Sequence, residues 1–193
     1  SECLVGSEMC IRDRTRDPKE ILAADKVVLP GVGSFGDAME NLHHFGLVPV
    51  IHQVVQEQTP FLGICLGLQL LFEKSEESPG VEGLGILKGE ILRIPAAEGL
   101  KIPHMGWNNI RFPNKGRLFA GVPEDAYVYF VHSYYLKAQD EKIVTATTEY
   151  GTHIHASVES GNLFACQFHP EKSSHVGLQI LKNFAKLEGK GGR

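Results

Sequence analysis

The chain has 193 residues, of which 42% are hydrophobic and 22% charged, so it can bury one core of ordinary composition. Its net charge of −4 gives no basic face for nucleic acid, and no apolar run is long enough to span a membrane. Four scattered cysteines without a Cys-x-x-Cys pair argue against a disulfide framework and a zinc site, and no secretory signal opens the chain, so a reducing cytoplasm is the expected compartment.

Residues 1–14 (SECLVGSEMCIRDR) show neither helical nor strand periodicity, and a regular pattern begins abruptly after them. We predict that they are a leader foreign to the fold and that residues 15–193 form a single domain. Asp17 and Pro18 then have the residue types of an N-cap and a first helical position, which predicts a short helix over 18–24.

From this helix onward, strand-like and helix-like segments alternate. The pattern predicts a strand at 26–29, two helices within 35–58 interrupted near 46–49, a buried strand at 61–65 and a helix opening at Leu66. Later segments predict hairpins over 85–112, with turns at Lys88-Gly89 and Glu98-Gly99, then strands at 126–131, 143–148 and 163–167 and a helix at 176–187. Early alternation and late hairpins predict an α/β fold with a mixed, largely parallel central sheet flanked by helices.

Cys65 ends the apolar run that begins at Pro60, inside the sequence Gly63-Ile64-Cys65-Leu66-Gly67. Gly-x-Cys-x-Gly after a strand is typical of a sharp strand-to-helix turn that exposes a nucleophile, and a helix N-terminus there favours a thiolate. Most cysteines on buried strands are only small hydrophobic residues, and we assign Cys166, in mid-strand, to that group. The position of Cys65 favours the functional interpretation.

His169 and Glu171 stand two residues apart at the end of the strand-like run 163–168, where α/β sheets place catalytic groups. A thiol, an imidazole and a carboxylate are the parts of a nucleophile, its base and the group that orients the base. The chain has nine histidines, so this pair alone would be weak. Six others are assigned to surface or packing: His43, His44, His52, His153, His155 and His175.

The segment from Gly31 to Gly36 matches the Gly-x-Gly-x-x-Gly of dinucleotide-binding folds, and Glu57 follows about 20 residues later. Glu57 falls before the next strand instead of at its end, and Pro30 stiffens the turn. We therefore favour a backbone segment whose N–H groups face an oxyanion beside Cys65. The only tryptophan lies in the loop 103–108 (PHMGWN), where it either caps the core or serves a partner interface.

These segments together resemble the triad-type, or class I, glutamine amidotransferases, a family with a flavodoxin-like fold. The elbow around Cys65 and His-Pro-Glu are shared across the family. Pro-Gly-Val-Gly, His-Met-Gly-Trp-Asn and Lys-Ser-Ser point to the branch that supplies ammonia to a cyclase of histidine biosynthesis. The matching stretches follow the family's order: 29–36 (LPGVGSFG), 63–72 (GICLGLQLLF), 104–108 (HMGWN), 129–134 (YFVHSY) and 167–174 (QFHPEKSS).

The resemblance implies that Cys65 attacks the side-chain amide of glutamine, that His169 moves the proton to ammonia and that Glu171 supports the ring. It implies no metal and no organic cofactor. By position in the family, glutamine contacts fall to Gln69, Glu77, Ser133 and Tyr134, and oxyanion contacts to the backbone N–H groups of Val32, Gly33 and Leu66.

The resemblance also implies a heterodimer in which ammonia passes into a (β/α)8-barrel cyclase. There ammonia would join a phosphorylated ribulosyl nucleotide, giving imidazole glycerol phosphate and an aminoimidazole carboxamide ribotide. The implied docking residues are His104, Trp107, Asn108, Tyr129 and Lys172.

One departure from the family lies at the start. Members open with an apolar strand and a helix before the segment matching Thr15–Pro18, and we expect this unit to be missing or replaced here by residues 1–14, which would expose a sheet edge. The alternatives are a glutaminase of another synthetase, a non-catalytic subunit that uses the Trp107 loop, and a related Cys hydrolase. Such a hydrolase commonly has His directly after the nucleophile, where this chain has Leu66.

Overall fold

A central sheet of eight strands runs through the part of the chain that the structure, a computed structural model, describes, namely residues 2–3, 10–11 and 14–190. Its strands are β3 (Val27–Gly31), β4 (Phe61–Cys65), β5 (Lys74–Ser75), β6 (Gly89–Arg93), β9 (Tyr134–Ala138), β10 (Val144–Glu149), β11 (His153–Ser160) and β12 (Leu163–Cys166). They lie in the order β3-β4-β12-β11-β9-β6-β5, and β10 pairs with β11.

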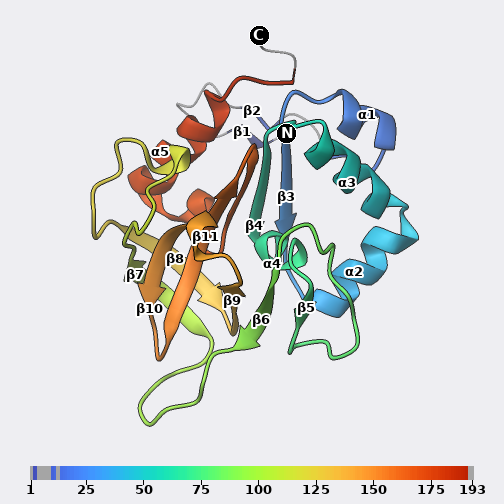
Figure 1. Ribbon diagram of the computed structural model, residues 1–193. Helices are drawn as coiled ribbons and strands as arrows, with labels where there is room; N and C mark the ends of the chain where they lie inside the picture. The colour runs from blue at the N-terminus through green and yellow to red at the C-terminus, as the bar shows by residue number, and fades with distance from the viewer. Residues whose placement is uncertain (1, 4–9, 12–13, 191–193) are drawn as a thin grey trace.

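The first three strands of this order are parallel to one another, as β5 is to β6, and the remaining pairs are antiparallel. The helices are α1 (Pro18–Ala23), α2 (Phe35–His44), α3 (Leu47–Gln56), α4 (Leu66–Leu70) and α5 (Ser174–Ala185), and three 3₁₀ turns are η1 (Arg117–Phe119), η2 (Glu141–Ile143) and η3 (Pro170–Lys172). Figure 1 shows α1–α3 on one side of β3 and β4 and α5 on the other. The predicted mixed α/β fold is confirmed.

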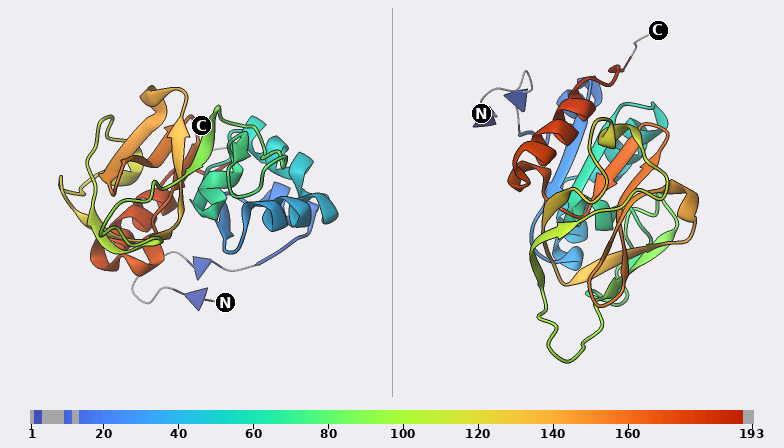
Figure 2. Two further views of the ribbon diagram at one scale, coloured as in Figure 1. Left: turned by 90° about the horizontal axis from the view of Figure 1, so that it is seen from below. Right: turned by 90° about the vertical axis from the view of Figure 1, so that its left-hand side faces the viewer.

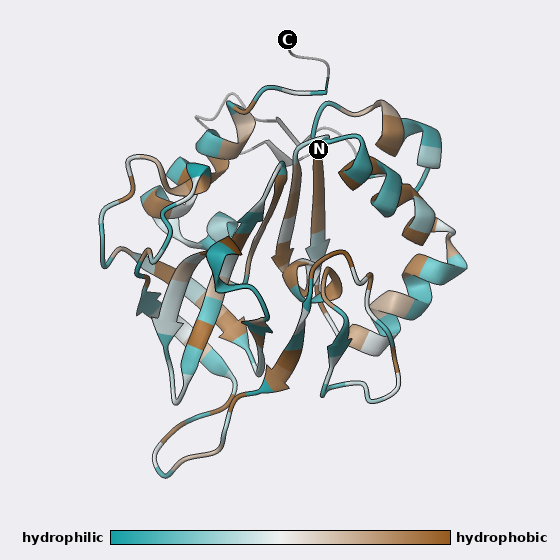
Figure 3. Cartoon of the chain, in the orientation of Figure 1, coloured by the Kyte–Doolittle hydropathy of each residue, from teal (hydrophilic) through white to brown (hydrophobic). Residues whose placement is uncertain are grey.

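Burial on both faces explains why the central strands read as continuous apolar runs. On β4, Phe61 packs into the cluster that includes α2 and α3, whereas Leu62 and Ile64 pack into the cluster that includes α5. Successive side chains of a strand point to opposite faces, so a strand covered twice is apolar throughout. Figure 3 shows β3 and β4 as hydrophobic strands between more mixed helices.

A separate two-stranded ribbon, the β7–β8 ribbon, stands beside the main sheet. It consists of β7 (His104–Asn109) and β8 (Tyr127–His132), which pair antiparallel with Trp107 opposite Tyr129. Alternation along the two strands leaves Met105, Trp107 and Tyr127 on the outside, with 62%, 52% and 57% of their surfaces exposed.

The predicted hairpin over 85–112 is wrong, because β6 pairs with β9 and β7 pairs with β8. The segment 94–103 carries the chain from one sheet to the other and projects from the body (Figure 2). Gly89 is the first residue of β6 and does not form a turn. It packs closely on β9, so that a Cβ there would lie 2.7 Å from the Lys137 carbonyl oxygen. The turn at Glu98-Gly99 is present, closed by a 3.0 Å hydrogen bond from Leu100 N to Ala97 O.

The predicted helix starts are borne out in part. Asp17 caps α1 by accepting from Lys19 N at 2.9 Å. The break between α2 and α3 comes earlier than predicted, at Phe45-Gly46, where Gly46 adopts a φ of 65°. Pro49 lies inside the first turn of α3, where its missing N–H has no helical partner to lose.

Most of the predicted leader, residues 1, 4–9 and 12–13, lies outside the described residues. Within it, β1 (Glu2–Cys3) and β2 (Cys10–Ile11) pair with each other in a sheet of their own, and β3 stands first in the order of the central sheet. The predicted strands and helix after residue 126 are present within a few residues, whereas β9 and β11 were not predicted. Across the described residues, no helix combines the length and the hydrophobicity that crossing a bilayer demands.

Candidate active site

Cys65 lies at a strained turn at the carboxyl end of β4. It is the last residue of the strand and the N-cap of α4, with φ 55° and ψ −109°, a region that non-glycine residues rarely occupy. A Cβ at Gly63 would lie 2.8 Å from the Gly67 carbonyl oxygen, so the turn closes only because that position has no side chain. The predicted strand–Cys–helix elbow is therefore present.

His169 and Glu171 follow β12, the strand paired with β4. His169 Nδ1 donates to Glu171 Oε1 at 2.6 Å, and the ring lines the same cavity as Cys65, whose side chain is the leading cause that raises the pKa of His169. The backbone of His169 is held as well, since its N–H donates to Tyr129 O at 2.9 Å and its carbonyl accepts from Ser173 Oγ at 2.6 Å. The imidazole is 5% exposed. Thiol, ring and carboxylate thus form one connected series.

The contacts of His169 govern where its proton resides. Hydrogen bonds to Cys65 and then to Glu171 raise the pKa of His169 to about 9, although burial acts to lower it. For Glu171, burial acts to raise the pKa, but hydrogen bonds to His169 and to its own backbone N–H, with the charges of His169 and Lys172, leave it below its usual value. Near neutral pH the ring therefore holds its proton beside an ionised carboxylate.

A cavity of about 390 Å³ opens onto the sulfur. It collects ten of the predicted site residues: Val32, Gly33, Cys65, Leu66, Gln69, Glu77, Ser133, Tyr134, His169 and Lys172. Glu171 stands behind His169. The cavity wall also includes Gly31, Pro103, Val131 and His132, which were not among the predicted site residues. Gly31 lies beside Cys65 because β3 and β4 are paired in register at these two residues.

The side chains of Gln69 and Gln167 are connected to the Cys65 sulfur by hydrogen bonds. Gln69 Nε2 donates to Tyr134 O at 3.1 Å and to Gln167 Oε1 at 3.0 Å, and Gln167 Nε2 donates to Cys65 Sγ at 3.6 Å. Gln167 is fully buried and was not predicted as a site residue. Period-2 alternation places residues 167 and 169 on one side of an extended segment, a signal that was available in the sequence.

Glu77 joins the cavity to the start of α2. Its Oε2 accepts from Phe35 N at 2.9 Å, and Ser78 Oγ accepts from Gly36 N at 2.9 Å. These two side chains satisfy N–H groups that a helix start leaves without partners. The segment after β5 therefore supports the Val32-Gly33 segment, which immediately precedes α2, and places a carboxylate at the wall of the cavity.

His104 and His132, which pair with each other at the end of the β7–β8 ribbon next to the cavity, form a buried pair. His104 Nδ1 lies 2.9 Å from His132 Nε2, and the His104 ring stacks on Phe130 and Tyr150. Burial lowers the pKa of His104 to about 4. Burial is also the main cause that lowers the pKa of His132 to about 3, with the charges of His104 and His169 adding to it against a hydrogen bond to Tyr134 O. Both rings are neutral at pH 7.

The buried pair predicts a loss of stability in mild acid. Both folded-state pKa values lie below 6.5, so the unfolded chain binds the extra protons and the free energy of unfolding falls as pH drops below about 6.5. Between pH 7 and pH 5 we expect His132→Asn to lose about 2 kcal/mol less than the wild type in urea titrations. His169, whose raised pKa acts mainly between about 6.5 and 9, is present in both proteins, so its contribution cancels in this comparison. A slope equal to that of the exposed-site variant His175→Asn would contradict this.

The predicted docking residues divide into two groups. Trp107, Asn108 and Tyr129 lie on the β7–β8 ribbon, where Trp107 and Tyr129 meet edge to face with centroids 6.1 Å apart, and Lys172 is exposed at the cavity. His104, the first residue of β7, is 3% exposed, so its side chain lies on the inner face of the ribbon and does not face outward with the others.

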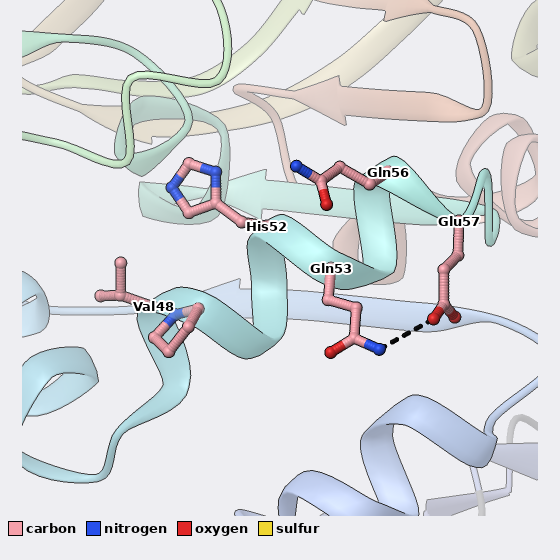
Figure 4. A pocket seen from close by; sticks show the side chains of 6 residues that line it. Val48, His52, Gln53, Gln56 and Glu57 are labelled. Carbon is pink, nitrogen blue, oxygen red and sulfur yellow. Dashed lines mark hydrogen bonds between the residues drawn. The ribbon is translucent and has the colours of Figure 1, made fainter.

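A second hollow lies on the outer face of α3, lined by Val48, Pro49, His52, Gln53, Gln56 and Glu57 (Figure 4). Its side chains come from that helix and the residue after it, and Gln53 Nε2 donates to Glu57 Oε1 at 2.8 Å. The hollow holds none of the predicted site residues. Within the described part of the chain, no group of three or more His, Cys, Asp and Glu side chains is arranged to hold a metal ion.

Comparison with known proteins agrees with this geometry. The family described as class-I glutamine amidotransferases matches residues 6–187. The imidazole glycerol phosphate synthase subunit HisH of Moorella thermoacetica is 57% identical over 173 residues, 90% of this chain and 81% of that protein. The HisH subunit of Methanocaldococcus jannaschii is 48% identical over 173 residues, covering 90% of this chain and 86% of that protein.

Among solved structures, a crystal structure of a glutamine amidotransferase superposes with a TM-score of 0.65 at 19% identity, covering 89% of this chain and 85% of that one. The glutaminase domain of Trypanosoma brucei CTPS with bound acivicin gives a TM-score of 0.61 at 19% identity, over 89% of this chain and 75% of that one. At this level of identity the structures bear on the fold.

Proposed function

The chain belongs to the class-I glutamine amidotransferase family, and we propose that it hydrolyses glutamine with Cys65, His169 and Glu171 as its catalytic triad. One observation carries the assignment of these residues. Cys65, at a strained turn, and the buried imidazole of His169 line one cavity, the Cys65 side chain is the leading cause that raises the pKa of that ring, and the ring donates to Glu171.

The proposed reaction begins with attack of the Cys65 sulfur on the side-chain amide carbon of glutamine. The oxygen of the tetrahedral intermediate carries the negative charge and accepts from backbone N–H groups of Leu66 and of the Val32-Gly33 segment, as donors at a helix start and a turn are suited to do. Because the raised pKa leaves His169 protonated, the ring gives its proton to the departing nitrogen and ammonia leaves.

The resulting thioester is then hydrolysed. His169, now neutral, takes a proton from water, whose oxygen attacks the thioester carbon; collapse of the second intermediate releases glutamate and restores the sulfur. Glu171 keeps Nδ1 protonated and steadies the positive ring at both steps. Gln69, Glu77, Ser133 and Tyr134 are the proposed glutamine contacts, with the Glu77 carboxylate suited to the substrate's ammonium group.

The assignment is tested by trapping. A glutamine-mimicking electrophile such as acivicin is expected to label the chain once, and mass spectrometry is expected to place the label on Cys65, with release of glutamate and ammonia abolished in parallel. Label on Cys166, or full hydrolysis by the labelled protein, would reject the assignment. The assay includes the cyclase and its nucleotide, since ammonia is proposed to be used there.

We further propose that the chain works as one domain over residues 15–193, in the cytoplasm, as the glutaminase of imidazole glycerol phosphate synthase. The partner is a (β/α)8-barrel cyclase in a heterodimer, which combines ammonia with a phosphorylated ribulosyl nucleotide to give imidazole glycerol phosphate and an aminoimidazole carboxamide ribotide. Support comes from the names of the HisH relatives, which are about half identical to this chain over most of its length.

The proposed docking surface is the β7–β8 ribbon together with Lys172. The ribbon exposes Trp107, Tyr127 and Met105, and aromatic residues and methionine are enriched at the centres of protein interfaces. One end of the ribbon reaches the cavity, because Val131 and His132 line its wall. His104 supports this surface from below.

Removing the central aromatic residue tests the docking surface. We expect Trp107→Ala to raise the Kd for the cyclase about thirtyfold or more, the effect of an aromatic hot spot, in isothermal titration calorimetry. Phe45→Ala is the matched control, because Phe45 is also an exposed aromatic residue (38%) but lies at the end of α2. Equal affinities of the two variants would place the partner elsewhere.

A further inference from the structure

We propose that Gln167 directs an amide N–H onto the reacting sulfur of Cys65. Gln69 is a positioning residue that fixes this direction, and His132 and His104, at one end of the β7–β8 ribbon, are positioning residues that hold the Tyr134 carbonyl to which Gln69 donates. The inference rests on the proposed role of Cys65 as the nucleophile. Hydrogen bonds join five side chains and the Tyr134 carbonyl to the Cys65 sulfur. The side chains are those of Asn108, His104, His132, Gln69 and Gln167.

The direction of the path is set at the Tyr134 carbonyl. This oxygen accepts from His132 Nδ1 at 2.8 Å and from Gln69 Nε2 at 3.1 Å. A carbonyl can only accept, so both partners must donate. His132 is therefore protonated on Nδ1, and the amide nitrogen of Gln69, not its oxygen, points toward Tyr134.

The same logic fixes Gln167. The Gln69 nitrogen has two hydrogens, and the second goes to Gln167 Oε1 at 3.0 Å. With its oxygen turned toward Gln69, Gln167 can present only its nitrogen to Cys65, where Nε2 lies 3.6 Å from Sγ. Gln167 has no exposed surface, so water does not compete for this donor.

At the far end of the path, Asn108 fixes the tautomers of the two histidines. Asn108 Oδ1 accepts from Asn109 N at 2.9 Å and its Nδ2 donates to Glu149 O at 3.0 Å, which fixes the amide. Nδ2 also lies 3.3 Å from His104 Nε2, which must then accept, leaving Nδ1 of His104 to donate to His132 Nε2 at 2.9 Å. The two halves of the path meet at the Tyr134 carbonyl, which accepts from both, and each imidazole is left as a single neutral tautomer.

The consequence for chemistry is at the sulfur. A sulfur that attacks an amide carries negative charge, and an N–H donor both stabilises that charge and holds the sulfur in one place. Gln69 and the two histidines do not touch the sulfur. Gln69 prevents the Gln167 amide from turning over, which would bring an oxygen against the nucleophile, and the two histidines act by holding the Tyr134 carbonyl to which Gln69 donates.

Alkylation of Cys65 tests the role of Gln167 without any need for turnover. Iodoacetamide rates are measured on the full chain from pH 5 to 10 by mass spectrometry of the Cys65 peptide. The groups that face the sulfur and titrate or carry charge are His169, in direct contact, and Glu77, His132 and Lys172 on the cavity wall. They are unchanged in Gln167→Met, a variant of similar length that lacks the donor.

For Gln167→Met we expect the rate–pH profile to move upward by about one pH unit or more, and the rate at pH 7 to fall about ten- to hundredfold. Ser157→Ala is the matched control: Ser157 is also fully buried and donates to Ala165 O at 2.8 Å on β12, but it lies off the path. A profile that coincides with that of Ser157→Ala would overturn the role of Gln167.

A second pair of variants tests the positioning residues and carries the test if Gln167→Met does not fold. In His132→Asn, the amide nitrogen can replace Nδ1 as donor to Tyr134 O, whereas His132→Leu has no donor. We expect alkylation at pH 7 to be at least about fivefold slower in His132→Leu than in His132→Asn. His155→Leu removes another buried imidazole, outside the path, and is the control. Equal rates in the two His132 variants would overturn the positioning role.

The two proposals fail in different ways. If the chain hydrolyses no glutamine but Gln167→Met shifts the profile, the proposed function fails and the orientation of the donor stands. If hydrolysis depends on Cys65 but the profile of Gln167→Met does not move, the further inference alone is rejected.

Discussion

Cys65→Ala is expected to lower kcat for glutamine hydrolysis by about 10⁴-fold or more, because removal of a nucleophile leaves only binding and oxyanion stabilisation to act on the amide. The substrate contacts are expected to survive, since Gln69, Glu77, Ser133 and Tyr134 reach the cavity from other elements. KM should therefore change little. Glutamate and ammonia release by the complex with the cyclase gives both constants.

Cys166→Ala is the matched control for this experiment. Cys166 is the other cysteine among residues 14–190; it lies on β12 beside Ile64, is fully buried and has a pKa raised by that burial and by the charges of Glu171 and Cys65. Its loss should leave kcat within about threefold of the wild type, since a buried thiol acts as a small hydrophobic residue. Residual activity in Cys65→Ala comparable with Cys166→Ala would mean that the sulfur of Cys65 performs no chemistry.

The local elements of the first half of the chain could be predicted because local sequence determines them. Asp17 with Pro18 specifies a helix start, and the apolar run 61–65 between turn residues specifies a buried strand. The elbow at Cys65 was predictable for the same reason, since Gly63 and Gly67 are needed wherever a strand turns directly into a helix that packs back on it.

Strand pairing could not be predicted in the same way. The segments β6 and β7 are neighbours in sequence, and a turn signal lies between them, but each finds its partner much later in the chain, at β9 and β8. Such pairing is decided by which apolar faces the whole sheet can cover, which no local pattern contains. β11 was not predicted, because its two histidines, His153 and His155, were taken for surface or packing residues and not for members of an alternating strand.

The site was predictable in its reactive groups but not in its supporting contacts. A thiol, an imidazole and a carboxylate are rare enough in suitable settings to stand out. Gln167 and His132 are common residue types, and their importance comes from the atoms that they contact. Gln167 contacts Cys65 Sγ, 102 residues away in the sequence, and His132 contacts Tyr134 O, two residues away. His104 was predicted as a docking residue from the family resemblance, together with Trp107, yet strand alternation turns it inward while Trp107 is exposed.

Gly67→Ala is expected to destabilise the fold by about 4 kcal/mol or more and to abolish glutamine hydrolysis. A Cβ at this position would lie 2.0 Å from the Leu29 carbonyl oxygen of β3, an overlap with backbone that no side-chain rotation relieves. The first turn of α4 would have to move away from β3. Since Cys65 is the N-cap of α4, the sulfur would move away from His169 with it.

The matched control is Gly46→Ala, at the start of α3. Gly46 has a positive φ of 65°, but a Cβ there would meet nothing within 4 Å, so the cost is confined to backbone strain of about 1 kcal/mol. Thermal unfolding should separate the two variants by about 6 °C or more for a chain of this length, with activity retained in Gly46→Ala. Similar melting temperatures would show that α4 can shift without cost, and the close contact between α4 and β3 would then not be what holds Cys65 in place.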